Sequence, residues 1–433
     1  MNDEMKRKLI SKLKNVDYLL LENLYYYRCL SVSQCWKICY KNAGVDLKTF
    51  VKKRVTPFHK LKLITINNTG KTYSLMITDI GIDILSTRKN LNNDFFDTKT
   101  KKMRTGTLKA SAIQMLPRLM NHQIALNQFV IDFSTIFKKQ ENYDTKFTYH
   151  DEKFMSKYLF VRPDGMISFN NLELFLEMDM GTENKKQLID KWNNYRLALS
   201  NELGRTDTKI IVLFILDCPA DKLQTRKNIV RYTIAQTLID DNFDKFDIYI
   251  GTKKELLEAV FHKILPIYFN CYFFDNFVID RLISQRHGFT SGDGSKLKKV
   301  FYSASYAYYI RKINEQNRIK RQDGKIQEYM FDEYLFGPMS ILNKIIYQEK
   351  NSSMFEMLYH RNINYVILVE SIDSIYNDLN VLDLLDVPDV YFTTAERLST
   401  RSFCEALFCF DSQGNYYHFQ DFGLTEKITE GAI

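Results

Sequence analysis

The acidic side chains of the segment RPDGMISFNNLELFLEMDMGTE, residues 162–183, have types and spacing that suggest chemistry. The part LELFLEMDM alternates as a β-strand does, so its leucines and methionines face one way. Glu173, Phe175, Glu177 and Asp179 face the other way. An ordinary solvated face would mix charges of both signs or use Thr and Lys. This face therefore needs an explanation.

The predicted turn of this hairpin brings two carboxylates together. If Asn170–Asn171 is a two-residue turn, Asp164 lies directly across from Glu177, and Arg162 lies across from Asp179. Cross-strand partners share a face, with Cβ atoms about 5 Å apart. Two carboxylates placed in this way repel one another and need a compensating cation.

A divalent metal ion is the cation that this pattern favours. Carboxylate oxygens are the ligands that Mg²⁺ prefers, and we expect Asp164, Glu177 and Asp179 to bind Mg²⁺ or Mn²⁺. Such an ion can activate water and stabilise the charge that develops on a phosphate, which is the chemistry of hydrolytic nucleases. Arg162 is the alternative source of positive charge, but it faces Asp179 first. Glu173 is interpreted as a solvated residue near the turn.

A helix is predicted to follow the strand, with Thr182 as its N-cap. Leu188, Trp192, Tyr195 and Leu199 have the spacing of its inward face. Its first turn carries Glu183 and Lys186 close to the end of the hairpin.

The surrounding elements predict an α/β fold with several domains. A long helix over 111–137, a strand over 208–217, a helix over 221–239 and a strand over 246–252 give a mixed sheet flanked by helices. With a P-D pair and an acidic motif on adjacent strands, residues 111–290 resemble the restriction-endonuclease-like fold.

The joining of a basic N-terminal region to RPDG, FLEMDMGTE and KWNNY resembles the replication-relaxation family of plasmid proteins, which is related to MobC-type relaxases. The resemblance covers roughly residues 15–200 and is most specific at Pro163–Asp164, at the acidic motif 177–183 and at Tyr195. It implies recognition of a plasmid origin and metal-dependent nicking or relaxation of one DNA strand.

The chain departs from the family's nuclease motif at one position. The usual third residue is Lys, and this chain has Asp179. Lys186 is the best-placed replacement, with Lys185 behind it; if neither reaches the site, the site binds metal or DNA without cutting. His122 matches a position where such folds place a polar active-site residue, although a lone helical histidine is also a common structural residue.

The N-terminal residues 1–90 are predicted to form a winged helix-turn-helix that binds double-stranded DNA. Residues 1–110 hold 22 Lys and Arg against 9 Asp and Glu, a balance of +13 in a chain of net charge +8. Three helices precede two alternating strands around a turn at residues 67–70, and Ser31 and Gln34 have the spacing of a capping box. Pro57 is expected to bend or end the third helix. The predicted DNA-contacting residues are Lys48, Lys52, Lys53, Arg54 and Lys71; a basic helical cap that binds no nucleic acid is the alternative.

Residues 91–110 are predicted to be a polar linker, and residues 291–433 a small α/β region whose role the sequence does not assign. Residues 296–325 carry nine Lys and Arg against two acidic residues, interleaved with tyrosines. This pattern suits single-stranded DNA, and equally a surface helix. A homodimer contact or docking of accessory plasmid proteins is the default role for the C-terminal region.

Several function classes lack their sequence signals. No apolar run is long enough for a membrane span, no CxxC pair suggests a zinc site, and the scattered cysteines fit a reduced, cytoplasmic protein. No HxH or HxxxH pair of a tyrosine relaxase and no phosphate loop of an ATPase is present.

The sequence therefore predicts a cytoplasmic nickase or relaxase of a plasmid or mobile element, active in replication, mobilisation or conjugation. It leaves two rivals open. One is a non-catalytic replication initiator or regulator that binds DNA through the winged helix, and the other is a structural or partitioning adaptor on the same DNA.

Overall fold

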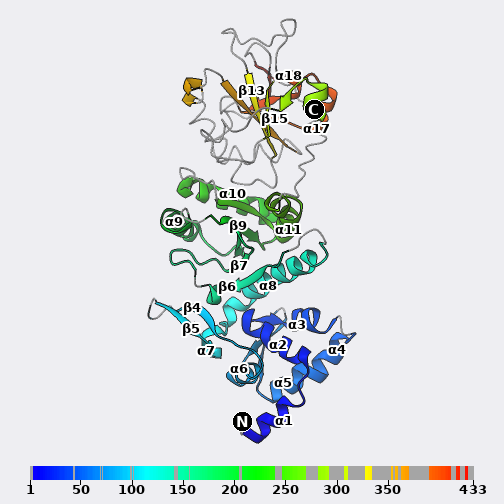
Figure 1. The fold of residues 1–433 in the computed structure, drawn as a ribbon, viewed down its shortest axis with the longest axis vertical. Coiled ribbons are helices and arrows are strands. Elements are labelled where there is room, and N and C mark those ends of the chain that lie inside the picture. Colours follow the sequence, from blue (N-terminus) through cyan, green and yellow to red (C-terminus); the bar gives the residue numbers. More distant parts are fainter. Residues whose placement is uncertain are drawn as a thin grey trace. The chain divides into compact units, whose positions relative to one another are not determined.

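In the computed structural model, drawn in Figure 1, the chain forms two compact units. The first contains residues 1–182 and 197–208, and the second contains residues 183–196 and 209–433. Both contain helices and sheets, and strand orientation is mixed, so the predicted α/β class is confirmed. The domain boundaries predicted from the sequence stay predictions. The structure describes residues 3–427 except 42–43, 69, 71, 98–99, 101, 141–144, 156, 204–206, 239–245, 270–280, 292–306, 311–326, 334–352, 355, 359–361, 370–389, 411–415 and 420–424.

The N-terminal part of the first unit is a small helical core closed by a three-stranded sheet of order β1-β3-β2. Leu20, Leu21 and Leu24 of one helix are fully buried in this core. The predicted capping box is confirmed, because Ser31 and Gln34 each bond the other's backbone N–H. The elements are α1 (Asp3–Ile10), α2 (Asn15–Tyr26), β1 (Leu30–Ser31), α3 (Val32–Cys39), α4 (Leu47–Phe50), α5 (Thr56–Lys60), β2 (Ile64–Asn68), β3 (Tyr73–Ile77) and α6 (Asp79–Leu85).

The helix that contains Pro57 does not end there. Helical structure runs from Leu47 to Lys60, and the wider π-helical turn Val51–Val55 joins α4 to α5. Pro57 lies in the first turn of α5. A π-turn immediately before a proline accommodates its missing N–H and the bulk of its ring, which is how this helix continues past the residue.

The segment expected to be a polar linker contains an antiparallel ribbon of two strands. β4 (Asn93–Asp97) pairs with β5 (Lys102–Gly106), with Phe95 opposite Arg104. Leu91 and Leu108, just outside the ribbon, are buried in the N-terminal core. The ribbon forms because apolar residues at both ends hold it to that core, a contact that the polar composition of the segment concealed.

The long helix predicted over 111–137 is two helices. α7 (Ala110–Ile113) ends before an extended stretch, and α8 (Pro117–Phe137) begins at Pro117. Proline favours the first turn of a helix, where its missing N–H leaves no bond unmade, and it disfavours helical structure in the residue before it.

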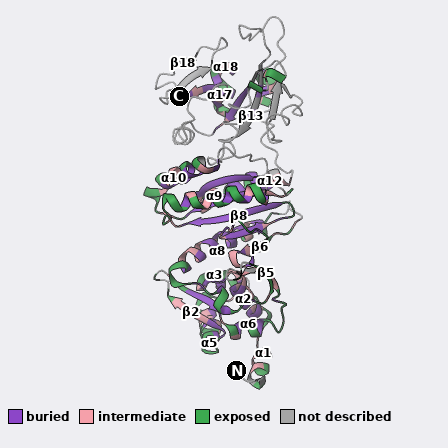
Figure 2. Ribbon diagram, turned by 90° about the vertical axis from the view of Figure 1, so that its left-hand side faces the viewer, coloured by how far each residue is buried: buried purple, intermediate pink, exposed green. Residues whose placement is uncertain are grey.

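Three antiparallel strands follow, β6 (Thr148–Asp151), β7 (Gly165–Ser168) and β8 (Leu172–Asp179), with a short 3₁₀ turn, Glu152–Phe154, after β6. β7 pairs Gly165 with Leu176 and Ser168 with Glu173, which is the register predicted from a turn at Asn170–Asn171. All eight residues of β8 are buried, as Figure 2 shows, so its acidic face is covered as well as its apolar one.

The second unit begins with α9 (Lys185–Asn201), most of which belongs to it, followed by β9 (Lys209–Leu216), α10 (Ala220–Leu238) and β10 (Phe246–Thr252). β9 and β10 pair in parallel, and the predicted strands and helix are confirmed. Trp192 and Tyr195 are fully buried, whereas Leu199 is only half-buried. The predicted N-cap Thr182 is wrong: Asn184 caps the helix, since its side chain accepts from Gln187 N at 3.0 Å and Gln187 bonds back to Asn184 N at 2.8 Å.

The rest of the second unit contains an eight-stranded sheet of order β11 to β18, in which β13, β14 and β15 are parallel and the other pairs antiparallel. Tyr308 and Tyr309 lie in strand β12, so a helix at that point is wrong, while most of 296–325 lies outside the described residues. None of the described helices is both long and apolar enough to cross a membrane. The elements are α11 (Lys253–Ala259), α12 (Leu265–Tyr268), β11 (Thr290–Ser291), β12 (Ala307–Ile310), β13 (Gln327–Glu333), β14 (Asn362–Leu368), β15 (Val390–Thr393), α17 (Ala395–Thr400), α18 (Phe403–Ala406), β16 (Phe408–Phe410), β17 (Tyr416–Phe419) and β18 (Thr425–Lys427), with π-helical turns Val260–Ile264 and Arg281–Arg286.

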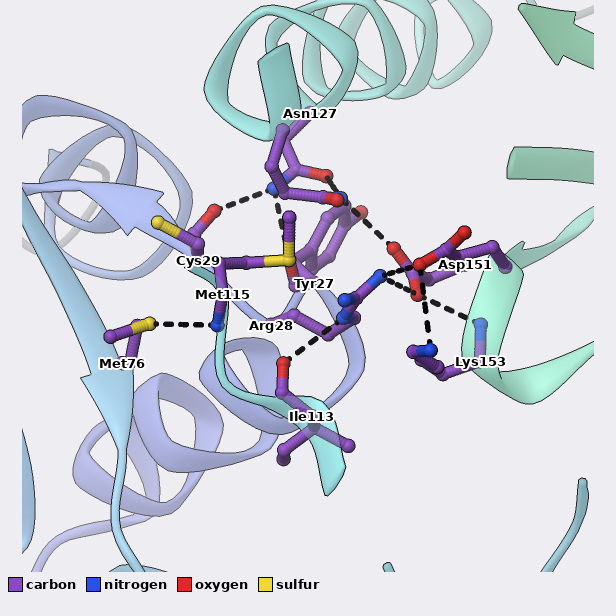
Figure 3. A network of polar contacts seen from close by, with 11 residues as sticks. Tyr27, Arg28, Cys29, Met76, Ile113, Met115, Asn127, Asp151 and Lys153 are labelled. Atoms are coloured by element: carbon purple, nitrogen blue, oxygen red, sulfur yellow. Dashed lines mark hydrogen bonds and ion pairs between the residues drawn. The ribbon is translucent and has the colours of Figure 1, made fainter. Parts of the chain in front are cut away.

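A buried polar network in the first unit joins the N-terminal core to α7, α8 and β6 (Figure 3). Arg28 has a left-handed backbone with φ 63°, and its guanidinium reaches Asp151 Oδ1 at 3.0 Å and Ile113 O at 3.0 Å. Gln123 donates to Asp151 Oδ2 at 2.9 Å. Asn127 donates to the carbonyl oxygens of Tyr27 and Cys29.

Asp151 is fully buried, and its charge state depends on Arg28. Burial raises the pKa of Asp151 to about 6, while the neighbouring Arg28 charge acts to lower that pKa. Burial acts to lower the pKa of Arg28, but the charges of Asp151 and Glu152 raise it above its ordinary value, so the guanidinium stays charged. The pair is therefore ionised at neutral pH, and each member compensates for the burial of the other.

Replacing Arg28 with Met leaves the buried Asp151 carboxylate without its cation, so we expect a loss of about 3–5 kcal/mol in unfolding free energy at pH 8. The loss must shrink toward pH 5. Without Arg28 the folded-state pKa of Asp151 rises further above its unfolded value of about 3.9, and protonation then relieves the penalty. Thermal unfolding at pH 5 and pH 8 measures both quantities.

The double variant Arg28→Met/Asp151→Asn is the matched control, because it removes both charges. Its stability should differ little between the two pH values. An Arg28→Met variant that is equally destabilised at pH 5 and pH 8 would show that Asp151 does not depend on Arg28.

Candidate functional site

The acidic site lies where β7 ends beside β8. Gly165 and Leu176 form the last pair of this ladder, and Asp164 stands at a bend directly before Gly165, outside the strand. Because side chains alternate along a strand, Glu177 and Asp179 belong to the same face of β8. The register beside the site is the predicted one, and the cross-strand placement of Asp164 against Glu177 stays a prediction.

Asp164 is fixed by contacts to the neighbouring strand and to α8. Its Oδ2 accepts from Met178 N at 2.8 Å, and His122 Nε2 lies 3.3 Å from the same oxygen. His122 Nε2 also lies 2.9 Å from Met178 O, and because a carbonyl oxygen only accepts, Nε2 carries the proton. The Asp164 and His122 side chains are 25% and 28% exposed, so this end of the hairpin is open to solvent.

Glu177 and Asp179 are buried, with 3% and 1% exposure. Asp179 Oδ1 accepts from Gly181 N at 2.9 Å, and Gly181 has a left-handed backbone with φ 73°. An ionised carboxylate is costly to bury unless hydrogen bonds or cations compensate for it. The sheet therefore carries two buried acids beside the partly exposed Asp164.

The donor set fits a hard divalent cation in its chemistry, since all three predicted ligands are carboxylates. In the part of the chain that the structure describes, no three His, Cys, Asp or Glu side chains gather closely enough to form a complete metal cage. Mg²⁺ keeps several waters and needs only one or two protein carboxylates when substrate phosphates supply the rest. A pair formed by Asp164 and Glu177 suits that second kind of site.

Glu173 is not the solvated residue that the sequence indicated. It is 4% exposed, pairs with Lys157 Nζ at 2.7 Å and accepts a hydrogen bond from the Tyr158 hydroxyl. Burial and the bond to Glu173 raise the pKa of Tyr158. The prediction failed because Lys157 and Tyr158, which cover this end of the face, come from a connection whose position the strand pattern does not reveal.

Tyr149 lies beside the site and had no signal in the sequence. A Cβ atom placed on Gly165 would come within 3.2 Å of the Tyr149 hydroxyl, so the ring packs directly over this glycine next to Asp164. The hydroxyl is buried and makes no hydrogen bond with any described residue. Burial raises the pKa of Tyr149, which keeps the hydroxyl protonated.

Glu183 and Lys186 belong to the second unit. Glu183 Oε1 pairs with Lys191 Nζ at 3.1 Å, and its backbone oxygen accepts from Arg226 Nη1 at 2.7 Å. Lys186 is exposed in the first turn of α9. Lys185 lies 4.1 Å from the ring centre of Tyr232, a cation–π contact that occupies its amine. Lys186 thus stays the predicted lysine of the site.

The predicted DNA-contacting residues differ in their surroundings. Lys48, Lys52 and Lys53 are exposed on the helix that runs from α4 to α5. Arg54 instead turns toward the core, where its Nε lies 2.9 Å from Oδ1 of the buried Asp17. Its first role is therefore structural, and Lys71 lies outside the described residues.

Comparison with known proteins gives one match. Residues 21–212, which include every acidic residue of the hairpin, match the model of a family described as replication-relaxation. No curated protein and no solved structure matches the chain. Over these residues the chain is similar to the replication-relaxation family, and this similarity indicates a role in the replication or relaxation of a plasmid or other mobile element.

Proposed function

We propose that the protein is a metal-dependent nickase or relaxase that cuts one strand of plasmid or mobile-element DNA. The observation that carries the proposal is the register of β7 and β8, whose last pair, Gly165 with Leu176, lies next to Asp164 and Glu177 at the open end of the hairpin. The family match over residues 21–212 supports DNA as the substrate.

The protein's own residues would prepare this site. Asp164 and Glu177, with Asp179, would hold Mg²⁺ or Mn²⁺, and a bound ion would supply an activated water and neutralise charge on the phosphate. Asp164 cannot rotate freely, because Met178 N holds one of its oxygens. His122 anchors α8 to Met178 O and stands beside Asp164. Lys186 and Glu183 stay site residues predicted from the sequence alone.

DNA recognition is assigned to the N-terminal region. Over residues 15–85, helices α2, α3 and α4–α5 precede the antiparallel strands β2 and β3, and this order supports the proposal of a winged helix, whose third helix would enter the major groove. The exposed Lys48, Lys52 and Lys53 lie on that helix. This region would bring origin DNA to the molecule and fix where the cut falls.

A non-catalytic replication initiator or regulator is the second candidate. Two observations favour it. Asp164 already serves a structural purpose by accepting from Met178 N, and the described residues contain no three-ligand metal cluster. In this case the acidic hairpin would only stabilise the sheet, and the winged helix would perform the function alone.

Nicking of a supercoiled plasmid that carries the region around the protein's own gene separates the two candidates. With Mg²⁺ or Mn²⁺, we expect the wild-type protein to form open circles and Asp164→Asn to be at least about 100-fold slower, because the variant loses the charge that holds the ion. Gel electrophoresis of the plasmid measures the rate, and a gel shift measures DNA binding, which should stay within about twofold.

Glu173→Gln is the matched control, since Glu173 is a buried acid on the same strand and face but pairs with Lys157. It should retain nicking within a few-fold. Open circles formed equally well by Asp164→Asn would exclude the proposed site, and binding without any metal-dependent nicking by the wild type would favour the initiator.

Another prediction concerns the helix that runs from α4 to α5 and carries Lys48, Lys52 and Lys53, which we call the recognition helix. Replacing Lys48, Lys52 and Lys53 with Ala should lower the salt dependence of DNA binding by roughly 2–3 in the log–log slope, because each phosphate contact contributes about 0.9. Fluorescence anisotropy with a duplex from the same region, at several salt concentrations, measures the slope. An unchanged slope would place DNA elsewhere on the molecule.

A further inference from the structure

In the ribbon formed by β4 and β5, strand β5 exposes consecutive side chains on both of its faces, which is rare for a β-strand. Lys102, Met103, Arg104 and Thr105 follow one another along β5, and all four are exposed, so neither face of this strand is covered. An antiparallel strand normally packs one face on a core. Phe95 of β4 packs against the N-terminal core and covers one part of the ribbon, but a ribbon of only two strands is marginally stable by itself in water. These features are typical of an arm that acquires its partner on binding.

The base of the ribbon is held firmly. Leu91 and Leu108 are buried in the N-terminal core, and Leu108 N donates to the Tyr25 hydroxyl at 2.9 Å. Ala110 N donates to Asp79 Oδ1 at 2.8 Å. Both ends are thus fixed, and the strands between them project from the first unit (Figure 1).

The charge of the ribbon selects its partner. Residues 93–109 contain five Lys and Arg and two Asp. The register places Asp97, Lys102 and Arg104 on one face, where Arg104 Nε pairs with Asp97 Oδ2 at 3.0 Å. The Arg104 side chain is still 55% exposed, and Lys102 makes no ion pair within the described residues. Exposed cations on a projecting ribbon complement a polyanion.

The ribbon lies beside the strand that leads to the acidic site. β4 packs against the short turn Glu152–Phe154, and Glu152 N donates to Asp164 O at 3.2 Å. Phe154 packs between Tyr25 and Tyr26 of the core. The ribbon is therefore connected to the backbone of Asp164 through one short turn, and it is separate in sequence from the recognition helix.

We propose that the strands β4 (Asn93–Asp97) and β5 (Lys102–Gly106) form a second DNA-binding element that holds the duplex beside Asp164. The major groove of B-DNA, about 12 Å wide, admits a two-stranded ribbon. Lys102, Arg104 and the exposed Lys109 at its base contact phosphates. The recognition helix selects the site, and the ribbon positions the DNA for cutting. This inference rests on the proposed function for its DNA substrate and for the role of Asp164, but not on cleavage itself.

The test measures DNA binding without any metal ion, so it is independent of nicking. Lys102→Ala/Arg104→Ala should weaken binding of a 30–40 base-pair duplex about tenfold near 0.15 M salt and lower the log–log salt slope by roughly 2. Lys102→Arg/Arg104→Lys keeps the charges and should bind as the wild type does. Lys138→Ala/Lys139→Ala, a pair of exposed lysines at the far end of α8, is the matched control and should change the slope little.

Three outcomes would overturn the inference. One is an unchanged slope in the ribbon variant while the Lys48/Lys52/Lys53 variant loses binding; the recognition helix would then bind DNA alone. Another is an equal loss in the ribbon variant and the α8 control, which would reflect net charge only. The third is new self-association without any change in DNA binding, which would show that these charges merely keep an exposed strand edge from pairing. Failure of nicking with an intact ribbon effect would reject the catalytic proposal alone.

Discussion

The ion pair between Arg28 and Asp151 is the interaction on which the arrangement of the first unit depends. Both side chains are almost fully buried, and the guanidinium also reaches the carbonyl of Ile113. One cation therefore connects the turn after α2, the end of α7 and the end of β6. A buried pair of this kind adds little net stability over apolar residues, but breaking it is costly, so it holds one arrangement against others.

This pair also controls the position of the acidic site. Gln123 of α8 donates to Asp151, and the next residue toward the N-terminus, His122, lies beside Asp164. Asp151 itself pairs with Gly165 in the sheet, directly after Asp164. The orientation of α8 and the register of β6 are thus set by the same carboxylate. If Arg28 moved, Asp151 would move with it. Asp151 contacts Gln123 and Gly165, which are the chain neighbours of His122 and Asp164, so the change would reach the acidic site over a short path.

The sequence was sufficient to predict the strand register at the site, but not the burial and the partners of the side chains around it. Alternation and the Asn170–Asn171 turn were sufficient for the register, because a slip of one residue would turn every leucine of β8 to the wrong face. The same pattern did not reveal that Glu173 is buried, since burial of the second face depends on Lys157 and Tyr158, which the strand does not encode. Arg28 gave no signal either, because its partner lies 123 residues away in the chain. The prediction of the first residue of α9 failed because two residues could cap the helix. Asn184 rather than Thr182 is the cap, since only Asn184 has a glutamine, Gln187, three residues later that can bond back to it.

Asp164 shows why a structural and a catalytic role need not exclude each other. The carboxylate takes the place of a strand partner for Met178 N, at the point where β7 has ended and β8 continues. A side chain that folding has already fixed loses no further rotamer entropy when it binds an ion. The contact that makes Asp164 useful to the sheet is therefore the one that would prepare it for a metal ion, and its presence alone does not decide between the two roles.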